Sequence, residues 1–297
     1  MERTAVKFDD VGRRYGDVHA LDGFSCAVPE GSVTALLGRN GAGKTTALKC
    51  LAGLLRPDRG EIFVLGKNVR ALDAETRAAM GYVSERQHLD PRLTIGQTME
   101  FTRAFYPTWD DGLALDLVDR LGLDPVTRVD ALSLGGTRKV ALALNLAFRP
   151  RLLVLDEPGA NLDAVVRREF LEVVLEMFRA EGMTVLYSTH ILPDVERVAD
   201  RVVLIERGLG RVDANLDDLK DRLKALRLVP INGRPITELE LPGTLARKRF
   251  GEELLITVDA FDDGRAVRAA EEGGARVEVL DLPLEEIFID YGSEQSR

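Results

Sequence analysis

Residues 38–46 read Gly38-Arg39-Asn40-Gly41-Ala42-Gly43-Lys44-Thr45-Thr46 and decide the fold of the chain. A short apolar run at residues 33–37 precedes them, and apolar residues with the spacing of a helix face follow. The stretch has the pattern G-x-x-x-x-G-K-[ST] between a strand and a helix, where that pattern forms a phosphate-binding loop. We therefore predict an α/β protein with the P-loop NTPase fold.

The loop offers several kinds of contact to a phosphate chain. Its glycines let the backbone curl, so that N–H groups point into one concavity at the positive end of the following helix. Lys44 would reach the β- and γ-phosphates, and the hydroxyl of Thr45 would ligate Mg²⁺. We expect a nucleoside triphosphate to be held by Gly38, Asn40, Gly41, Gly43, Lys44, Thr45 and Thr46.

Composition limits the class of protein. The 297 residues can hold one large α/β domain and a smaller second one. No apolar run approaches the ~18 residues that span a membrane, and the first four residues do not resemble a signal peptide. The net charge of −9 disfavours extensive nucleic-acid binding. Cys26 and Cys50 stand alone in apolar surroundings, as buried thiols of a reducing compartment do.

Strands and helices alternate along most of the chain. Residues 5–29 indicate antiparallel strands, and the apolar runs at 152–155, 184–187 and 201–205 indicate buried strands of a mainly parallel sheet. Residues 71–80 are expected to be helical. Residues 94–121 have a helical pattern that Pro107 should break, and we interpret 90–131 as a helical insertion.

Two of the buried strands end in residues that can carry chemistry. Ligands bind at the carboxyl ends of strands in open α/β sheets. Asp156, Glu157 and His190 are at the carboxyl ends of two of these predicted strands. Asp156 can hold Mg²⁺, and Glu157 can polarise an attacking water as a general base. A lone histidine is usually structural, but at this position His190 can bond the γ-phosphate and the attacking water.

Two further residues have a plain and a functional interpretation. Tyr15 either packs on the sheet at a strand end or stacks on the nucleotide base. Ser133 either only caps the helix that follows it or also contacts a phosphate.

The order of these motifs resembles that of the ATP-binding cassette (ABC) ATPases, from about residue 6 to residue 212. A signature upstream of the strand ending in Asp-Glu, with a histidine downstream, is specific to that family. The correspondences are Tyr15 with the adenine-stacking aromatic, Gly38–Thr46 with Walker A, 132–136 with the signature LSGGQ, 152–157 with Walker B, 161–163 with the D-loop and His190 with the switch histidine.

The resemblance implies a mechanism in which two such domains pair head to tail. Each ATP would lie between Walker A of one domain and the signature of the other, with Ser133 and Gly135 contacting the partner's γ-phosphate and Asp163 at the interface. ATP and Mg²⁺ are the implied cofactors. The implied catalytic residues are Glu157, His190 and Lys44, and the implied metal ligands are Thr45, Asp156 and Glu85.

Several positions depart from the family pattern. Leu134 replaces a signature glycine and Gly136 replaces the glutamine. Glu85 stands where the family has the glutamine that senses the metal, and Gln87 would take that role if the loop were shifted. Ala160 stands where serine is common before the D-loop.

Because the chain has no apolar run that could span a membrane, it resembles ATPase subunits whose permease is a separate polypeptide. Residues 104–110 and 284–288 resemble bacterial drug-, antibiotic- or peptide-exporter ATPases, although Phe105, Tyr106 and Trp109 could equally pack the helical insertion. The implied partners are a transmembrane permease and a second ATPase subunit, identical or not, at the cytoplasmic face of the membrane. The alternatives are a soluble ATPase without a transport role and a weakly hydrolysing regulatory half of a heterodimer.

The predicted domains are an ATPase domain at 1–212 with a helical subdomain at about 90–147, a linking segment at 213–226, and a small α/β domain at 227–297. A charged helix is expected at 216–226, strands at 253–258 and 275–280, and helices at 265–272 and 283–291. No cluster of reactive groups marks this C-terminal part, so dimerisation or packing is its simplest interpretation.

Overall fold

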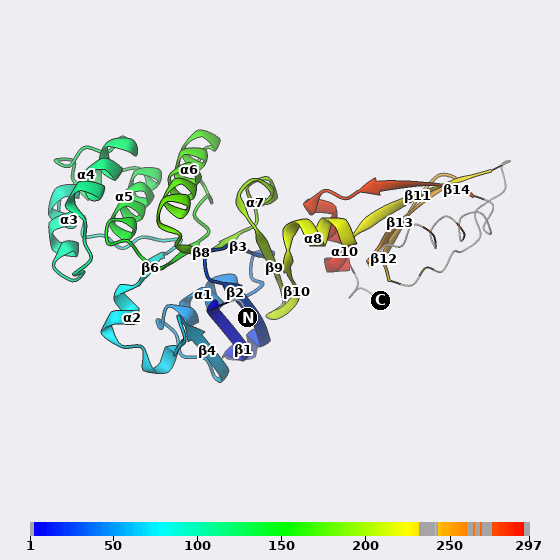
Figure 1. Ribbon diagram of the computed structural model, residues 1–297, viewed down its shortest axis with the longest axis horizontal. Helices are drawn as coiled ribbons and strands as arrows, with labels where there is room; N and C mark the ends of the chain where they lie inside the picture. Colours follow the sequence, from blue (N-terminus) through cyan, green and yellow to red (C-terminus); the bar gives the residue numbers. More distant parts are fainter. Residues whose placement is uncertain are drawn as a thin grey trace. The chain divides into compact units, whose positions relative to one another are not determined.

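In the computed structural model of the chain, six strands form the sheet that carries the phosphate-binding loop (Figure 1). Their spatial order is β10 (Leu209–Asn215), β9 (Arg201–Glu206), β3 (Val33–Leu37), β8 (Thr184–Thr189), β7 (Leu152–Asp156) and β6 (Met80–Val83). The last five pair in parallel. Every residue of β3, β7 and β8 is buried, as in a parallel sheet covered on both faces.

The structure describes residues 3–231, 241, 243–259, 264, 268 and 275–293. The chain divides into two units, residues 1–213 and 214–297. None of the helices in these described ranges is long and apolar enough to cross a membrane.

A second sheet of the first unit is antiparallel and packs against the helix that follows the loop. Its order is β2 (Val18–Pro29), β1 (Thr4–Tyr15), β4 (Arg59–Val64) and β5 (Lys67–Asn68). Helix α1 (Lys44–Leu51) buries Leu48 and Leu51 in one apolar cluster with Phe24 of β2 and Val154 of β7. The cluster therefore ties α1 to both sheets and holds the loop at its N-terminus in place.

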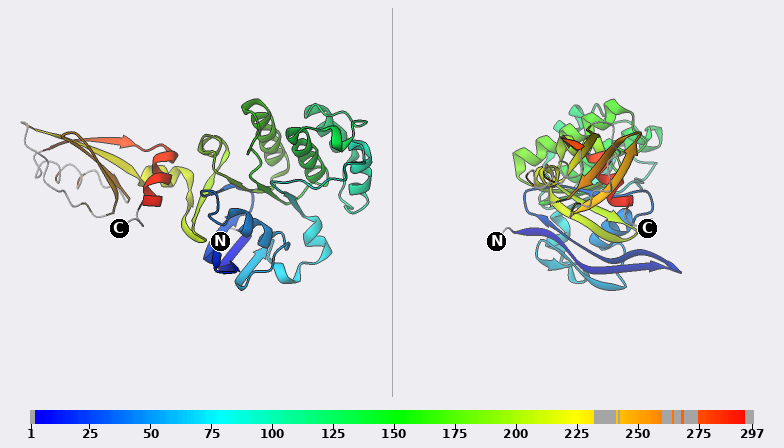
Figure 2. Two further views of the ribbon diagram at one scale, coloured as in Figure 1. Left: turned by 180° about the vertical axis from the view of Figure 1, so that it is seen from behind. Right: turned by 90° about the vertical axis from the view of Figure 1, so that its right-hand side faces the viewer.

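Three helices of the first unit lie together at one end of it (Figures 1 and 2). They are α3 (Ile95–Arg103), α4 (Asp111–Arg120) and α5 (Leu134–Leu146), with Ile95, Val118, Val140 and Leu144 forming their shared core. The other helices described in this unit are η1 (Val69–Ala71), α2 (Ala74–Ala78), η2 (Val129–Ala131), α6 (Ala164–Glu181) and α7 (Leu192–Val198).

The aromatic residues of the helical insertion divide into two groups. Tyr106 stacks on Phe148 with ring centroids 3.9 Å apart, and Trp109 packs against the shared helical core. Phe105 is exposed and meets the exposed Phe101 edge to face at 5.2 Å. Tyr106 and Trp109 are thus packing residues, whereas the pair Phe101–Phe105 faces solvent.

Two predicted helices are shorter in the structure. Only Ala74–Ala78 of the expected helix 71–80 is α-helical, because Asp73 caps it and Met80 already pairs in β6. The helix expected at 216–226 ends at Arg222 as α8 (Leu216–Arg222), and Lys224 begins strand β11 (Lys224–Pro230). Residues 224–226 are extended because β11 pairs with a strand on each side. In the sequence, charged residues that favour helices hide the alternating pattern of this strand.

The second unit contains a four-stranded antiparallel sheet. Its order is β12 (Thr244–Phe250), β13 (Glu253–Val258), β11 and β14 (Ala275–Asp281), and α10 (Leu284–Ser293) follows. Asp290 of α10 is buried, accepts a hydrogen bond from Thr257 at 2.6 Å and pairs with Lys248 at 2.9 Å. The helix expected at 265–272 lies outside the described residues except for Arg268. The domain boundaries expected from the sequence stay a prediction.

Replacing Phe148 by alanine should destabilise the first unit by about 3–5 kcal/mol, because its ring is 1% exposed and loses the stack on Tyr106. Phe105→Ala is the matched control, since that ring is 64% exposed and its removal should change stability by less than about 0.5 kcal/mol. Urea unfolding followed by circular dichroism measures both. Equal losses in the two variants would contradict the packing described here.

Candidate functional site

A cavity of about 430 Å³ lies over the phosphate-binding loop. Its volume falls in the range of small-molecule sites. The loop can border it only with glycine at Gly43, where φ is 112° and a Cβ would stand 2.3 Å from the carbonyl oxygen of Ala20. The lining residues are Ala20, Arg39, Asn40, Gly41, Gly43, Lys44, Thr45, Thr46, Glu85, Glu157, Ala160, Asn161 and His190.

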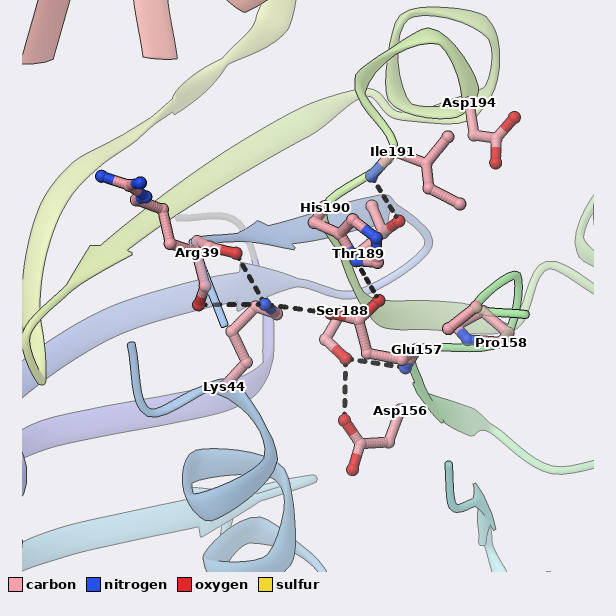
Figure 3. Close-up of polar contacts among 12 residues, drawn as sticks. Arg39, Lys44, Asp156, Glu157, Pro158, Ser188, Thr189, His190, Ile191 and Asp194 are labelled. Carbon is pink, nitrogen blue, oxygen red and sulfur yellow. Dashed lines mark hydrogen bonds and ion pairs between the residues drawn. The ribbon is translucent and has the colours of Figure 1, made fainter. Parts of the chain in front are cut away.

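The ammonium group of Lys44 is buried at the floor of this cavity (Figure 3). Its Nζ donates to the carbonyl oxygen of Gly38 at 2.6 Å and lies 2.9 Å from Oε1 of Glu157. A buried ammonium must be paired with acceptors or an anion. Lys44 is therefore held by the groups that a phosphate would replace.

Glu157 links Lys44 to His190. Its second carboxylate oxygen, Oε2, lies 2.9 Å from Nδ1 of His190, and its backbone N–H donates to the Ser188 hydroxyl at 2.9 Å. Glu157 also has a φ of 48°, a left-handed conformation that costs a non-glycine residue of order 1–3 kcal/mol. The strain is compensated by the contacts around it, which hold the carboxylate between Lys44 and His190.

Asp156 lies one residue earlier and is 1% exposed. Its Oδ1 accepts hydrogen bonds from Thr45 at 3.0 Å and from Ser188 at 2.9 Å. Burial raises the pKa of Asp156, the two hydroxyl donors act against this, and the carboxylates of Glu157 and Glu85 add to the increase. A buried carboxylate in this state gains from a nearby cation.

The oxygen donors at this point fit Mg²⁺. Mg²⁺ in phosphate sites takes one or two protein oxygens and completes its shell with phosphate and water. Asp156 and the Thr45 hydroxyl already meet, and Glu85 lines the same cavity. Within the described ranges no group of three His, Cys, Asp or Glu side chains is arranged to hold a metal ion.

Glu85, and not Gln87, borders the cavity. The side-chain amide of Gln87 donates to the carbonyl oxygen of Ser84 at 2.6 Å, and Gln87 does not line the cavity. The shifted-loop alternative therefore has no support in this conformation.

The residues expected to contact a partner's nucleotide lie away from this cavity. Ser133 is exposed and caps α5 by accepting from the N–H of Gly136 at 3.1 Å. Asp163 is exposed and caps α6 by accepting two N–H bonds at 3.0 Å. Gly135 lies against the start of α6, since a Cβ there would stand 3.5 Å from Leu162.

Tyr15 does not line the cavity either. It ends β1 with its ring partly exposed, and the guanidinium of Arg13 stacks over the ring at 5.0 Å. Arg13 is in turn bound to Asp58 at 2.8 Å. The ring is accessible for stacking, so neither of its two interpretations is excluded.

Sequence reasoning gave no role to Ser188 or Arg138. Ser188 of β8 bonds both acidic residues at the end of β7, and its signal was its place two residues before His190, which directly follows β8. Arg138 is buried and donates to backbone carbonyls of two loops that border the cavity. Its signal in the sequence was a charge, next to that of Lys139, in a helix that is otherwise rich in apolar residues.

Comparisons with known proteins agree with this geometry. Residues 21–160 match the family model described as ABC transporter. The Nod factor export ATP-binding protein I of Rhizobium etli is 32% identical over 97% of this chain and 93% of its own length. The daunorubicin resistance ATP-binding protein DrrA2 of Streptomyces coeruleorubidus is 33% identical over 97% of this chain and 95% of its own.

A solved structure described as the ATP binding subunit of an ABC transporter has the same fold. It superposes with a TM-score of 0.67 at 28% identity and covers 73% of this chain and 92% of its own. The P-loop NTPase fold predicted from residues 38–46 is confirmed.

Asp156→Asn should raise the free energy of unfolding of the metal-free protein at neutral pH. The raised pKa means that the folded state keeps the Asp156 proton to a higher pH than the unfolded state does. Wild-type stability is therefore lost as pH rises from 3.8, the ordinary value, through the raised folded-state pKa, whereas asparagine does not titrate.

Urea unfolding in EDTA across this pH range measures the effect. The difference between Asp156→Asn and wild type should shrink as pH falls toward 3.8. An exposed control, Asp116→Asn, should show no such trend. A difference that grew at low pH would contradict the assignment.

Proposed function

Because the chain belongs to the ABC transporter family and is an ATPase of that family, we propose that it energises export through a separate membrane-spanning permease. The observation that carries the proposal is the line Lys44–Glu157–His190 at the floor of the cavity, with both contacts of Glu157 at 2.9 Å. These contacts support the proposal because they bring together a cation that would bind phosphate, a carboxylate that would act as general base and an imidazole that would form a hydrogen bond. The domain in which it stands is residues 1–212, followed by the smaller C-terminal domain.

The hydrolytic step follows from what each side chain can exchange. When phosphates enter, Lys44 turns from Glu157 and the Gly38 carbonyl to the β- and γ-phosphates. Glu157 then loses its cation and can accept a proton from the attacking water. His190 keeps Glu157 oriented through Nδ1 and offers its other ring nitrogen to the γ-phosphate or the water.

The residues Thr45, Asp156 and Glu85 would hold Mg²⁺. When bound, the ion neutralises charge on the β- and γ-phosphates. Ser188 keeps the Asp156 carboxylate in place by donating to Oδ1 at 2.9 Å. Tyr15 would stack on the adenine.

We further propose that two cassettes work as a head-to-tail dimer. Ser133 and Gly135 open a 13-residue helix, and Ser133 is exposed and lies outside its own chain's cavity. A helix N-terminus attracts anions, so a partner's γ-phosphate fits there. Asp163 would lie at the same interface.

Export is supported by the two relatives described above, and the proposed permease would hold the chain at the cytoplasmic face of the membrane. Their names refer to Nod factor export and daunorubicin resistance. The permease would contact the exposed pair Phe101–Phe105, of which Phe101 lies on α3 and Phe105 in the turn that follows it. A pair of exposed aromatic rings suits an interface.

A regulatory half of a heterodimer is the second candidate. It is favoured by Leu134, an exposed leucine in the signature where the family has glycine. A larger side chain at this point would weaken the contact with a partner's phosphate.

Glu157→Gln should bind ATP as wild type does while ATP turnover falls by about 10²–10⁴-fold, because an amide cannot accept the proton. Fluorescent-nucleotide titration and phosphate release measure the two quantities. Glu172→Gln is the matched control, since Glu172 is exposed on α6 and pairs only with surface arginines. Equal turnover in Glu157→Gln and wild type would remove Glu157 from the role of base.

Coexpression with a multi-span membrane protein encoded by a neighbouring reading frame should give a complex whose ATP turnover responds to the permease. Phe101→Asp combined with Phe105→Asp should abolish copurification and keep ATP binding. Leu115→Asp, an equally exposed apolar position on α4, is the control. Copurification with ribosomes or nucleic acid instead of a membrane protein would overturn the transport proposal.

A further inference from the structure

Arg138 is a buried cation that no described carboxylate neutralises directly. Its side chain is 2% exposed. One guanidinium nitrogen, Nη1, donates to the carbonyl oxygens of Pro158, at 3.2 Å, and of Ala160, and the other, Nη2, donates to the carbonyl oxygen of Glu85 at 3.2 Å. Burial lowers the pKa of Arg138, and the charges of Glu85 and Glu157 act against this. Its partners are thus the backbones of two loops.

Both loops belong to the ATP site of the same chain. Residues 158–160 directly follow Glu157. A residue with left-handed backbone stands on each side of this segment, Glu157 with φ 48° and Asn161 with φ 58°. Such backbone persists only where its surroundings determine it. The Arg138 guanidinium supplies two of those contacts, and its third holds the backbone of Glu85.

Arg138 also belongs to the helix that starts at the signature. It lies five residues after Ser133, in the second turn of α5. A helix transmits a displacement of its first turn to its second. A shift of α5 on contact with a partner's nucleotide would therefore move the guanidinium relative to the loops around Glu85 and Glu157.

We propose that Arg138 is a positioning residue that couples the signature of each chain to the base Glu157 and the loop at Glu85 of that same chain. The inference rests on the proposed two-cassette function. Arg138 does not line the cavity over the phosphate-binding loop. It acts by fixing the positions of the two loops, because its rigid planar fork directs one nitrogen to each loop, which the single nitrogen of an ammonium group cannot do.

Arg138→Lys tests the proposal in the full chain, because lysine keeps the charge and loses the fork of donors. Nucleotide affinity should stay within about two-fold, since the P-loop is untouched, while kcat falls about 10- to 100-fold with KM nearly constant. Amide hydrogen exchange should become faster at residues 85–87 and 159–162 and stay unchanged in α1. Guanidinium ions at millimolar concentration should partly restore turnover to Arg138→Ala, and ammonium ions should not.

Lys139→Gln is the matched control. Lys139 is the next residue of α5, and its ammonium bonds the Leu121 carbonyl oxygen and Glu169, which lie outside the loops of the ATP site. Its kcat and loop exchange should resemble wild type. Wild-type kcat in Arg138→Lys, a parallel loss of nucleotide affinity, or an equal effect of Lys139→Gln would each overturn the inference.

The failure of the proposed function has a different signature. A wild-type chain that does not hydrolyse ATP with its permease present would reject the function. The exchange measurement would still decide whether Arg138 holds the two loops, because it needs no turnover.

Discussion

A buried ammonium group must find anions or acceptors, and Lys44 finds them in a backbone carbonyl and in Glu157. The neighbouring elements serve this requirement. Parallel strands bring the Walker A loop and the Asp156–Glu157 pair to one edge of the sheet, and Ser188 and His190 fix the two carboxylates from the adjacent strand. Removing one partner of a buried ion pair is costly, so a phosphate must enter as Lys44 leaves.

The same ion pair connects binding to chemistry. Lys44 neutralises Glu157 in this structure, and under the proposed function Glu157 would become a free base when phosphate oxygens take the lysine away. Binding of the nucleotide therefore prepares the proton acceptor at the place where it is needed. The arrangement uses one cation for two successive partners.

The sequence predicted the parts of the site whose chemistry demands particular residues at particular spacings. Gly43 and Lys44 follow from phosphate geometry, and Asp156 and Glu157 from the end of a buried strand. Arg138 was missed because its partners are backbone carbonyls 20 to 53 positions away, which no side-chain pattern reveals. The helix expected at 216–226 is too long because the charged residues of this stretch favour a helix locally. The pairing of β11 on both edges, a tertiary effect, extends the backbone instead.

At residue 157 the backbone conformation and the proposed chemistry favour different residue types, because the backbone of Glu157 is left-handed. Glycine would relax the backbone there, and only a carboxylate can serve as base. Laboratory evolution under selection for heat resistance alone would thus favour sequences that discard the reaction. Any scheme to harden this protein must keep catalysis under selection throughout.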